Sequence, residues 1–356
     1  VAGGPGSLFW LWVAAFFGMA TIFAEAVLAQ TYRTKDEQGR VLGGPAYYIG
    51  NVIGSSFFAS VFAVLLAVTY GLIFNSVQAN TISLSMQTSF GFDTQMTGLA
   101  IAGFTALVIF GGLTRIAKVV GVMVPVMAGA YILVALAVTA LNITMVPEVL
   151  VTIVRCAFDF DAVLGAGFGM ALMTGIKRGL FSNEAGMGST PHAHALAKVK
   201  RPQDQGEIAI VSVFIDTFIV LTLTAMVILT SGMLNPGAPD GLQGTELAQA
   251  AFKASLGSAG MAFVAICMLF FAFSTIIGWY FFGEQNVKYL FGVKAVKVYA
   301  CIAVVCVALG AVLEAPLVWN LSDLFNALMV FPNLLALLAL SGLVAKAARG
   351  GDALRK

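Results

Sequence analysis

The polar segment at residues 179–191 is the first place in this sequence where chemistry is expected. It reads GLFSNEAGMGSTP and follows Lys177 and Arg178 in a chain that is otherwise mostly apolar. Glycine weakens a helix by about 1 kcal/mol per residue and proline breaks it, so no membrane helix runs smoothly through this segment. Unwound backbone at membrane depth has free N–H and C=O groups that can hold a solute and an ion. The segment predicts a binding site at a helix break; a plain polar loop between two spans is the alternative.

A second group of candidates is a set of amides within an apolar run at residues 70–80. Asn75, Gln78 and Asn80 follow one another at near-helical spacing. Uncharged amides can bind an amino or carboxylate group without the full cost of burying a charge. Hydrogen bonding between helices is an equally good interpretation of these side chains.

A third group lies in the apolar run at residues 271–280. Ser274 and Thr275 offer hydroxyl oxygens, which are hard ligands of the type that a small cation takes. Such hydroxyls often bond to their own helix instead, so the pair alone is weak evidence for a cation site. Trp279 lies one turn further on, and a tryptophan facing a cavity would limit the size of the solute that fits.

Ionisable residues inside apolar spans are functional candidates because their burial is costly. Glu184 in the polar segment could pair with Arg178 and brace the unwound backbone. Asp216 is a candidate for a buried partner or a proton site. Glu25, near the end of the first apolar run, fits either a structural pairing or a side chain that reaches the membrane surface.

The composition places the chain among polytopic membrane proteins in contact with the lipid bilayer. Hydrophobic residues make up 60%, charged residues make up 10%, and the mean hydropathy is +0.94. A soluble domain carries roughly 25% charged residues. The net charge of +2 gives no reason to expect nucleic acid, and the four cysteines and two histidines form no metal motif and indicate no cofactor.

About nine apolar runs are long enough to cross a membrane, which takes roughly 20 residues. They lie near residues 7–31, 54–88, 97–113, 119–141, 161–180 (continuing brokenly to 196), 207–231, 258–284, 296–313 and 321–345. Four of these runs precede the broken run and four follow it. Two inverted halves of five helices would put the rest of the first half at 1–141 and the second half, with the C-terminal tail, at 142–356. This count leads us to expect a further helix upstream of Val1.

The distribution of Lys and Arg predicts the orientation. Most of the 19 basic residues fall in loops on one side, which the positive-inside rule makes cytoplasmic. Val1 is then outside and Lys356 inside. The basic residues on the cytoplasmic side are Arg33, Lys35, Arg40, Arg115, Lys118, Lys198, Lys200, Arg201, Lys288, Lys294, Lys297, Lys346, Arg349, Arg355 and Lys356.

Six short motifs stand out along the sequence: GPGSLFWLW (4–12), GMATIFAE (18–25), GGPAYYI (43–49), QAN (78–80), FSNEAGMGS (181–189) and FSTIIGW (273–279). With these motifs the sequence resembles a known family, the alanine or glycine:cation (sodium) symporters of the amino acid–polyamine–organocation superfamily. The match between FSNEAG and the family motif is highly specific, and the resemblance extends from residue 4 to about residue 292.

The resemblance implies an all-α leucine-transporter-type fold in a bacterial-type plasma (inner) membrane, with the spans above as core helices two to ten. It also implies residue roles. Gln78, Phe181 and Trp279 would line the substrate pocket, Ser274 and Thr275 would supply oxygens to sodium, and Ser182 and Asn183 would belong to the unwound sixth core helix. The family's first broken helix, expected before residue 3, is absent, so the chain as given is expected to be truncated at its N-terminus.

The leading interpretation is a symporter that couples sodium entry to uptake of alanine or glycine. A proton-coupled small amino acid transporter using Asp216 or Glu184 is the alternative. An enzyme is disfavoured because no nucleophile–base or metalloprotease motif occurs. A passive channel is disfavoured because no repeated charge ring or carbonyl filter occurs.

Overall fold

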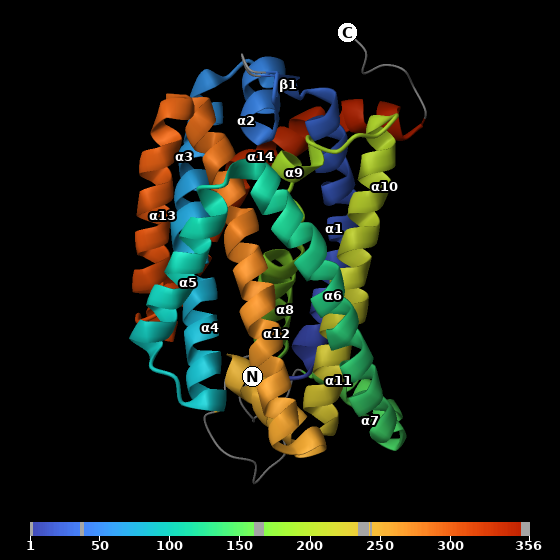
Figure 1. Cartoon of the computed structure of the whole chain (residues 1–356). Coiled ribbons are helices and arrows are strands. Elements are labelled where there is room, and N and C mark those ends of the chain that lie inside the picture. The colour runs from blue at the N-terminus through green and yellow to red at the C-terminus, as the bar shows by residue number, and fades with distance from the viewer. Residues whose placement is uncertain (1–2, 36–38, 160–166, 234–241, 243, 350–356) are drawn as a thin grey trace.

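The computed structural model describes residues 3–35, 39–159, 167–233, 242 and 244–349, and nearly all of them are helical (Figure 1). The first half contains α1 (Gly6–Thr31), β1 (Thr34–Lys35), β2 (Val41–Leu42), α2 (Pro45–Tyr48), η1 (Ile49–Ile53), α3 (Ser56–Val68), η2 (Thr69–Phe74), α4 (Asn75–Phe90), α5 (Thr94–Ile109) and α6 (Gly112–Leu141). The second half contains η3 (Ile143–Met145), α7 (Val146–Ala157), α8 (Phe168–Asn183), α9 (Pro191–His194), α10 (Pro202–Val213), η4 (Phe214–Leu221), α11 (Thr222–Thr230), α12 (Gly244–Phe291), η5 (Val293–Ala295), α13 (Val296–Gly310) and α14 (Ala315–Ala348).

Within these described residues, seven helical stretches are long and apolar enough to cross a membrane. They coincide with seven of the predicted spans: Gly6–Thr31, Ser56–Phe90, Gly112–Leu141, Pro202–Thr230, Gly244–Phe291, Val293–Gly310 and Ala315–Ala348. The other two predicted spans, at 97–113 and 161–180, correspond to α5 and α8, and residues 161–166 of the second lie outside the described part of the chain. Each of these has 16 residues, fewer than the roughly 20 of a full span. The chain is therefore an all-α polytopic membrane protein.

Two segments that lie between predicted spans contain helix. The segment after the span at 119–141 forms η3 and α7, and α7 is amphipathic and, with 12 residues, shorter than a span. In the segment before the span at 258–284, the described residues from Gly244 onward already form the first part of α12. Gly257 (φ 66°, ψ −154°) then interrupts that helix before its membrane-spanning part. Residues 234–241 and 243 lie outside the described part of the chain.

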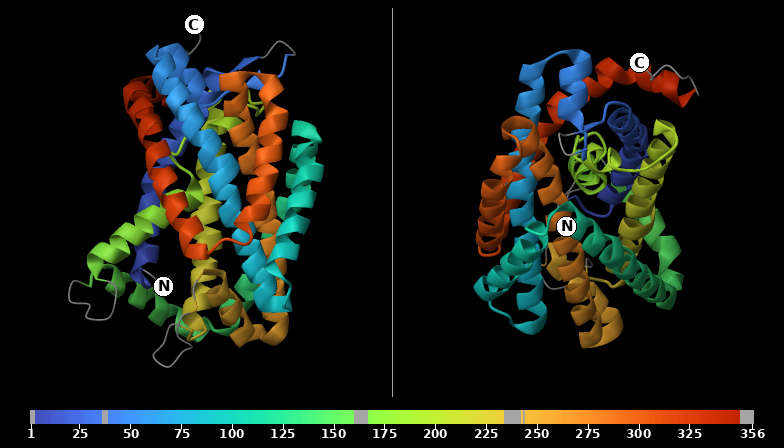
Figure 2. Two further views of the ribbon diagram at one scale, coloured as in Figure 1. Left: turned by 90° about the vertical axis from the view of Figure 1, so that its left-hand side faces the viewer. Right: turned by 45° about the horizontal axis from the view of Figure 1, so that its top comes forward.

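The long helices run up and down through the molecule in a regular alternation (Figures 1 and 2). In the orientation of Figure 1, α1 and α5 run upward while α3–α4 and α6 run downward. In the second half α10–α11 and α13 run downward while α12 and α14 run upward. Each helix of the first series therefore has a counterpart of opposite direction in the second.

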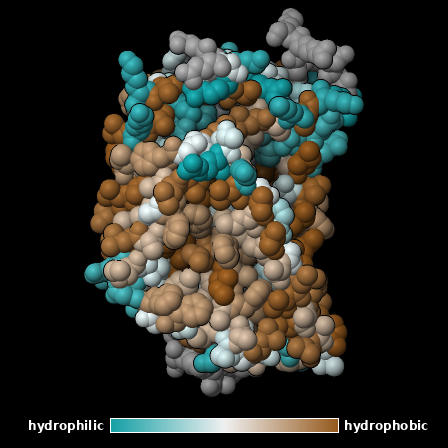
Figure 3. Space-filling view, in the orientation of Figure 1, coloured by the Kyte–Doolittle hydropathy of each residue, from teal (hydrophilic) through white to brown (hydrophobic). Residues whose placement is uncertain are grey.

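The surface has the polarity expected of a protein embedded in lipid. On the face shown in Figure 3, apolar residues cover the middle of the molecule and hydrophilic residues gather at its upper end. Large apolar side chains that are mostly exposed, such as Phe17, Leu107 and Val126, point outward from the helices. So extensive an apolar surface would be a liability in water and suits a bilayer.

Local sequence explains where several of these helices begin, end and widen. The side chains of Ser55 and Asp93 accept backbone N–H groups at the starts of α3 and α5. Gly91, in the left-handed region (φ 71°), ends α4. Two π-helical stretches, η2 and η4, widen the helices of residues 56–90 and 202–230, and such widenings often accompany functional sites.

The largest buried cluster surrounds the segment between α8 and α9. It includes Tyr70 and Phe74 from η2, Met187 from the segment itself, Trp279 from α12 and Met329 from α14. Three long helical elements thus meet at the interrupted helix, and their side chains fix its position.

Candidate functional site

The helix that begins with α8 is broken, as the sequence predicted. It ends at Asn183, and helical structure resumes only at Pro191 in α9. Glu184 (φ 55°), Gly186 (φ 86°) and Gly188 (φ 81°) all lie in the left-handed region, which glycine adopts freely and glutamate does not. The backbone of 184–190 therefore leaves polar groups that other elements must satisfy.

The carboxyl group of Glu25 in α1 satisfies two of them. Its Oε2 accepts the N–H of Gly186 at 3.0 Å, and its Oε1 accepts the N–H of Gly188 at 2.8 Å. Glu25 is fully buried, so its side chain does not reach the membrane surface. Of the two interpretations left open by the sequence, the structural pairing is correct.

Asn333 in α14 completes this network. Its Nδ2 donates to Glu25 Oε1 at 2.7 Å and to the carbonyl of Gly186 at 3.0 Å. Its Oδ1 accepts from the hydroxyl of Tyr48 in α2 at 2.5 Å. We refer to Glu25, Asn333 and Tyr48 as the anchor. The anchor ties the break to α1, α2 and α14.

A second tether joins the far end of the break to α12. The Nδ1 of His192 lies 2.7 Å from the carbonyl of Ser189, and its Nε2 lies 2.9 Å from Nδ2 of Asn286. Because an amide NH₂ can only donate and a carbonyl can only accept, the ring is neutral with its proton on Nδ1. His192 therefore holds the break by orientation rather than by charge.

Glu184, at the start of the break, is also held by α12. Its Oε1 accepts from Nε1 of Trp279 at 2.6 Å, and its Oε2 accepts from the hydroxyl of Ser189 at 2.5 Å. The left-handed backbone of Glu184 is strained for a residue other than glycine. The two hydrogen bonds compensate for this strain and fix Trp279 beside the break.

Aromatic rings from four elements, α8, η2, α12 and α14, surround this point. The ring of Phe181 lies 5.0 Å from Phe74, 6.0 Å from Trp279 and 5.5 Å from Trp319 of α14, measured between centroids. Tyr70 packs edge-on against Trp279 at 5.3 Å. The structure therefore brings together Phe181 and Trp279, which the resemblance assigned to one pocket.

The candidate amides Gln78, Asn183 and Asn80 have different surroundings in the structure. Gln78 is partly buried one turn beyond Phe74 and makes no hydrogen bond with the described residues. Asn183 is buried, and its Oδ1 accepts the N–H of Ala185 while its Nδ2 has no partner among them. Asn80 instead donates to the carbonyls of Gly310 and Leu313, so it bonds helices together.

Ser182 and Asp216 are in direct contact. The Ser182 hydroxyl donates to Asp216 Oδ2 at 2.8 Å, and Thr217 donates to the same oxygen at 3.2 Å. Asp216 lies in the π-helical stretch η4. It is therefore coupled to the last turn of α8 next to the break, as a buried partner would be.

Ser274 and Thr275 bond within their own helix. Both hydroxyls donate to the carbonyl of Phe271, at 2.8 and 2.9 Å. This geometry uses the proton of each hydroxyl and leaves its lone pairs free. Neither side chain has another partner among the described residues, so the lone pairs of both oxygens can still coordinate a cation.

The expected pairing of Arg178 with Glu184 is wrong. Arg178 instead pairs with Asp323 of α14 at 3.1 Å, and Lys177 joins the same Oδ2 at 2.5 Å. The guanidinium carbon of Arg178 also lies 4.7 Å from the ring centroid of Trp319. Glu184 and Arg178 are six residues apart on a helix that ends between them, so they point toward different neighbours.

Sequence reasoning missed the contribution of α14. Asp323, Asn326 and Asn333 all lie on this helix, and we singled out none of them. A signal was present, because Ser322, Asn326, Met329 and Asn333 recur at intervals of three and four residues in an otherwise apolar span. This spacing places them on one face of a helix.

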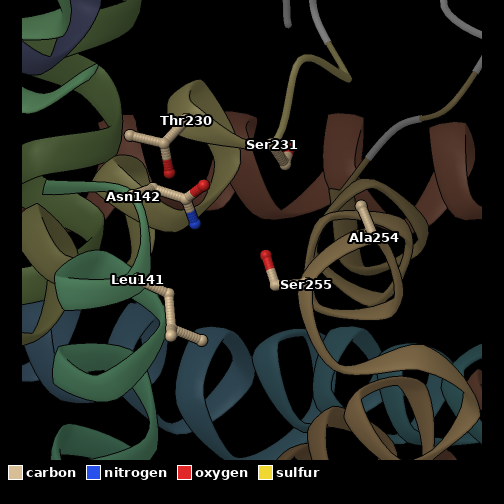
Figure 4. A pocket seen from close by; sticks show the side chains of 6 residues that line it. All are labelled: Leu141, Asn142, Thr230, Ser231, Ala254 and Ser255. Carbon is tan, nitrogen blue, oxygen red and sulfur yellow. The ribbon is translucent and has the colours of Figure 1, made fainter. Parts of the chain in front are cut away.

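A pocket of about 270 Å³ also opens where α6 and α11 end (Figure 4). None of its six lining side chains is charged or aromatic. Asn142, Thr230 and Ser231 donate to carbonyls of their own helices. The pocket therefore has no charged group for the ammonium or carboxylate of an amino acid, and it lies apart from the break. The lining residues are Leu141, Asn142, Thr230, Ser231, Ala254 and Ser255.

Two glycines of the break provide a matched test of its packing. A Cβ at Gly188 would lie 2.6 Å from the ring of Phe62 and 3.0 Å from Asn333, whereas a Cβ at Gly186 would have 3.8 Å of space. Both alanine variants carry the left-handed strain of about 1–2 kcal/mol. We expect Gly188→Ala to lose about 1–3 kcal/mol more from overpacking.

Thermal unfolding of the two purified variants measures this difference. Gly188→Ala should unfold at the lower temperature and transport more slowly. Equal melting temperatures would contradict the packing around Gly188.

Comparison with known proteins places this arrangement in a family. Residues 1–352 match the sodium:alanine symporter family. The chain is 42% identical to the sodium/alanine symporter AgcS of Methanococcus maripaludis, covering 100% of this chain and 79% of that protein. It is 43% identical to the amino-acid carrier protein AlsT of Bacillus subtilis, covering 97% and 73%.

A third relative has another substrate in its name. The probable sodium/glutamine symporter GlnT of Bacillus subtilis is 43% identical, covering 96% of this chain and 71% of that protein. All three relatives are transporters and none is an enzyme. The family match over nearly the whole chain and this degree of identity show that the chain belongs to the sodium:alanine symporter family.

Proposed function

We propose that this protein is a secondary active symporter that couples sodium entry to the uptake of a small amino acid, alanine or glycine, by alternating access. The observation that carries the proposal is the helix break held by Glu25, Asn333 and Trp279 and faced by the ring of Phe181. Such a break supplies backbone groups for a zwitterion, while the rings limit the space for its side chain.

The direction of the helices supports a leucine-transporter-type fold with two inverted repeats. We assign residues 1–141 to the first repeat and 142–356 to the second, with its tail. The pairs α1 with α10–α11, α3–α4 with α12, α5 with α13 and α6 with α14 run in opposite directions (Figure 1). Their contacts follow the same symmetry, since α6 packs on α12 as α14 packs on α3.

Roles for the individual residues follow from this assignment. Gln78, Phe181 and Trp279 would form the walls of the substrate pocket, and Ser182 and Asn183 would border it from the break. Ser274 and Thr275 would give sodium their free lone pairs, which suit a hard cation. Arg178, Glu184 and Asp216 would link the site to α14, α12 and η4.

We also propose the orientation in the plasma membrane. Arg33, Arg115, Arg201 and Lys346 lie close to those ends of α1, α6, α10 and α14 that point toward the upper part of Figure 1, and hydrophilic residues gather at the upper end of the molecule in Figure 3. By the positive-inside rule this end is cytoplasmic. α1 then begins at the outer side and α14 ends at the inner side.

Uptake into proteoliposomes tests the proposed coupling. We expect labelled alanine to accumulate with an inward sodium gradient and not with potassium in its place, in full-length protein at constant pH. Competition by glycine and by glutamine measures the substrate range. This test is needed because one relative is named for alanine and another for glutamine. Accumulation driven by a pH gradient without sodium would contradict sodium coupling and favour the proton alternative.

The variant Asp216→Asn separates the two coupling ions further. Asparagine keeps an oxygen that can accept from Ser182 but carries no titratable proton. For sodium coupling, we expect sodium-driven uptake to persist within about threefold of the unmodified protein, a change of less than about 1 kcal/mol. Loss of all uptake with normal folding would make Asp216 an ion-coupling residue.

A further inference from the structure

One face of α14 lies along α8 and the break. Trp319 contacts Phe181, Asp323 pairs with Lys177, and Asn333 bonds Gly186. Residues 319, 323, 326, 330 and 333 follow one another at intervals of three and four, so they lie on the same face of the helix. Asn326 therefore lies between the ion pair of Asp323 and the anchor at Asn333.

Asn326 is buried there without a hydrogen-bond partner for its oxygen. Its side chain is only 8% exposed, and Oδ1 bonds to none of the described residues. Leaving a buried polar atom unpaired costs about 1–3 kcal/mol. Buried polar atoms in folded proteins nearly always have partners, so this oxygen requires an explanation.

The neighbours of Asn326 on α14 place it beside the proposed pocket. Trp319, about two turns before it, contacts Phe181, and Asn333, about two turns after it, bonds the backbone of the break. Met329, about one turn away, packs in the same buried cluster as Phe74 and Trp279. An unpaired amide oxygen therefore lies on the stretch of α14 between the aromatic rings and the break.

We propose that Asn326 is a substrate-binding residue and that its Oδ1 accepts a hydrogen bond from the ammonium group of the amino acid. This rests on the proposed function. An ammonium group has three donors and loses its hydration on entering the site, so it needs acceptors. An amide oxygen supplies one without adding a charge that would hold the substrate too tightly to release. Neither the motifs nor the resemblance assigned this role to any residue of α14.

The variant Asn326→Leu tests the proposal because leucine has nearly the same shape and no polar atom. We expect the KM for alanine to rise about tenfold, equivalent to about 1.4 kcal/mol. Ser322→Ala is the matched control. Ser322 is fully buried on the same helix, and its hydroxyl also has no partner among the described residues. It lies one turn further from Asn333 and the break than Asn326 does and has no part in the proposed contact with the ammonium group, so we expect its loss to leave the KM unchanged.

Competition by lactate for alanine uptake reports recognition of the ammonium group, which a change in packing alone would not alter. Lactate has a hydroxyl where alanine has its ammonium group, so the ratio of the two inhibition constants measures recognition of that group. We expect Asn326→Leu to reduce the preference for alanine over lactate about tenfold and Ser322→Ala to preserve it. Asn326→Ala, which also removes the amide, gives the same test if the leucine variant does not fold.

The outcomes separate the two proposals. No sodium-driven alanine uptake by the unmodified protein would overturn the proposed function. Normal uptake by the unmodified protein, together with an unchanged KM and lactate ratio in Asn326→Leu, would overturn the role of Asn326 alone. Equal changes in Asn326→Leu and Ser322→Ala would also overturn it, because the effect would then come from packing.

Discussion

Replacing Glu25 with leucine is expected to abolish transport and to cause a large loss of stability. The change leaves the N–H groups of Gly186 and Gly188 and one donor bond of Asn333 without an acceptor inside the protein. Each buried donor left unpaired costs about 1–3 kcal/mol, so the total loss is expected to be about 3 kcal/mol or more. The break would then no longer be held against α1, and the geometry of any site built on it would be lost.

The variant Glu25→Gln provides the graded comparison. Glutamine has the same length and one carbonyl oxygen, which can still accept from Gly188 and Asn333, but its NH₂ group cannot accept from Gly186. We expect a stability and an uptake rate between those of the unmodified protein and Glu25→Leu, measured by thermal unfolding in detergent and by proteoliposome uptake. If both variants transport alanine normally, the anchor is not what holds the break.

Replacing Trp279 with alanine is expected to change which amino acids the protein accepts. Trp279 is buried, packs beside Phe181 and Tyr70, and donates to Glu184. Truncating a buried tryptophan typically costs about 3–5 kcal/mol of stability and leaves a cavity. The cavity lies where the side chain of the substrate would be, so larger amino acids such as leucine should enter while alanine is bound less tightly.

Two further variants separate an effect on the shape of the pocket from a general loss of stability. Trp279→Phe keeps a ring but removes the hydrogen bond to Glu184, so it should lower the uptake rate and keep the preference for small substrates. Trp12→Ala removes a partly buried tryptophan and its hydrogen bond to Thr222, away from the break. We expect competition assays to show an unchanged substrate range for Trp12→Ala. An unchanged range for Trp279→Ala would mean that Trp279 is not a pocket wall.

The helix break and the membrane class could be predicted because both depend on nearby residues. Glycine and proline act on the backbone at their own positions, so residues 179–191 were sufficient to predict that α8 would end there. Apolar runs of membrane length likewise need no tertiary contact. The amphipathic helix α7 was missed because its pattern is too short and too polar for the span criterion.

Partners across the molecule could not be predicted in the same way. Arg178 was expected to pair with Glu184, which is close in sequence, but its partner Asp323 is 145 residues away. For Asp216 the sequence indicated a buried partner without identifying Ser182. Many polar side chains can satisfy a buried charge, and only the packing of helices decides which one is within reach.

By itself the sequence determined that this is a helical membrane protein with a helix break within residues 179–191, and that Phe181 and Trp279 lie in motifs of a known family. Only the tertiary structure decided what holds the break. Glu25 and Asn333 are 308 residues apart and meet because α1 and α14 pack against each other and against the same unwound backbone. A local pattern reports the conformation of its own segment. The partner of a buried polar atom depends on the arrangement of the whole bundle.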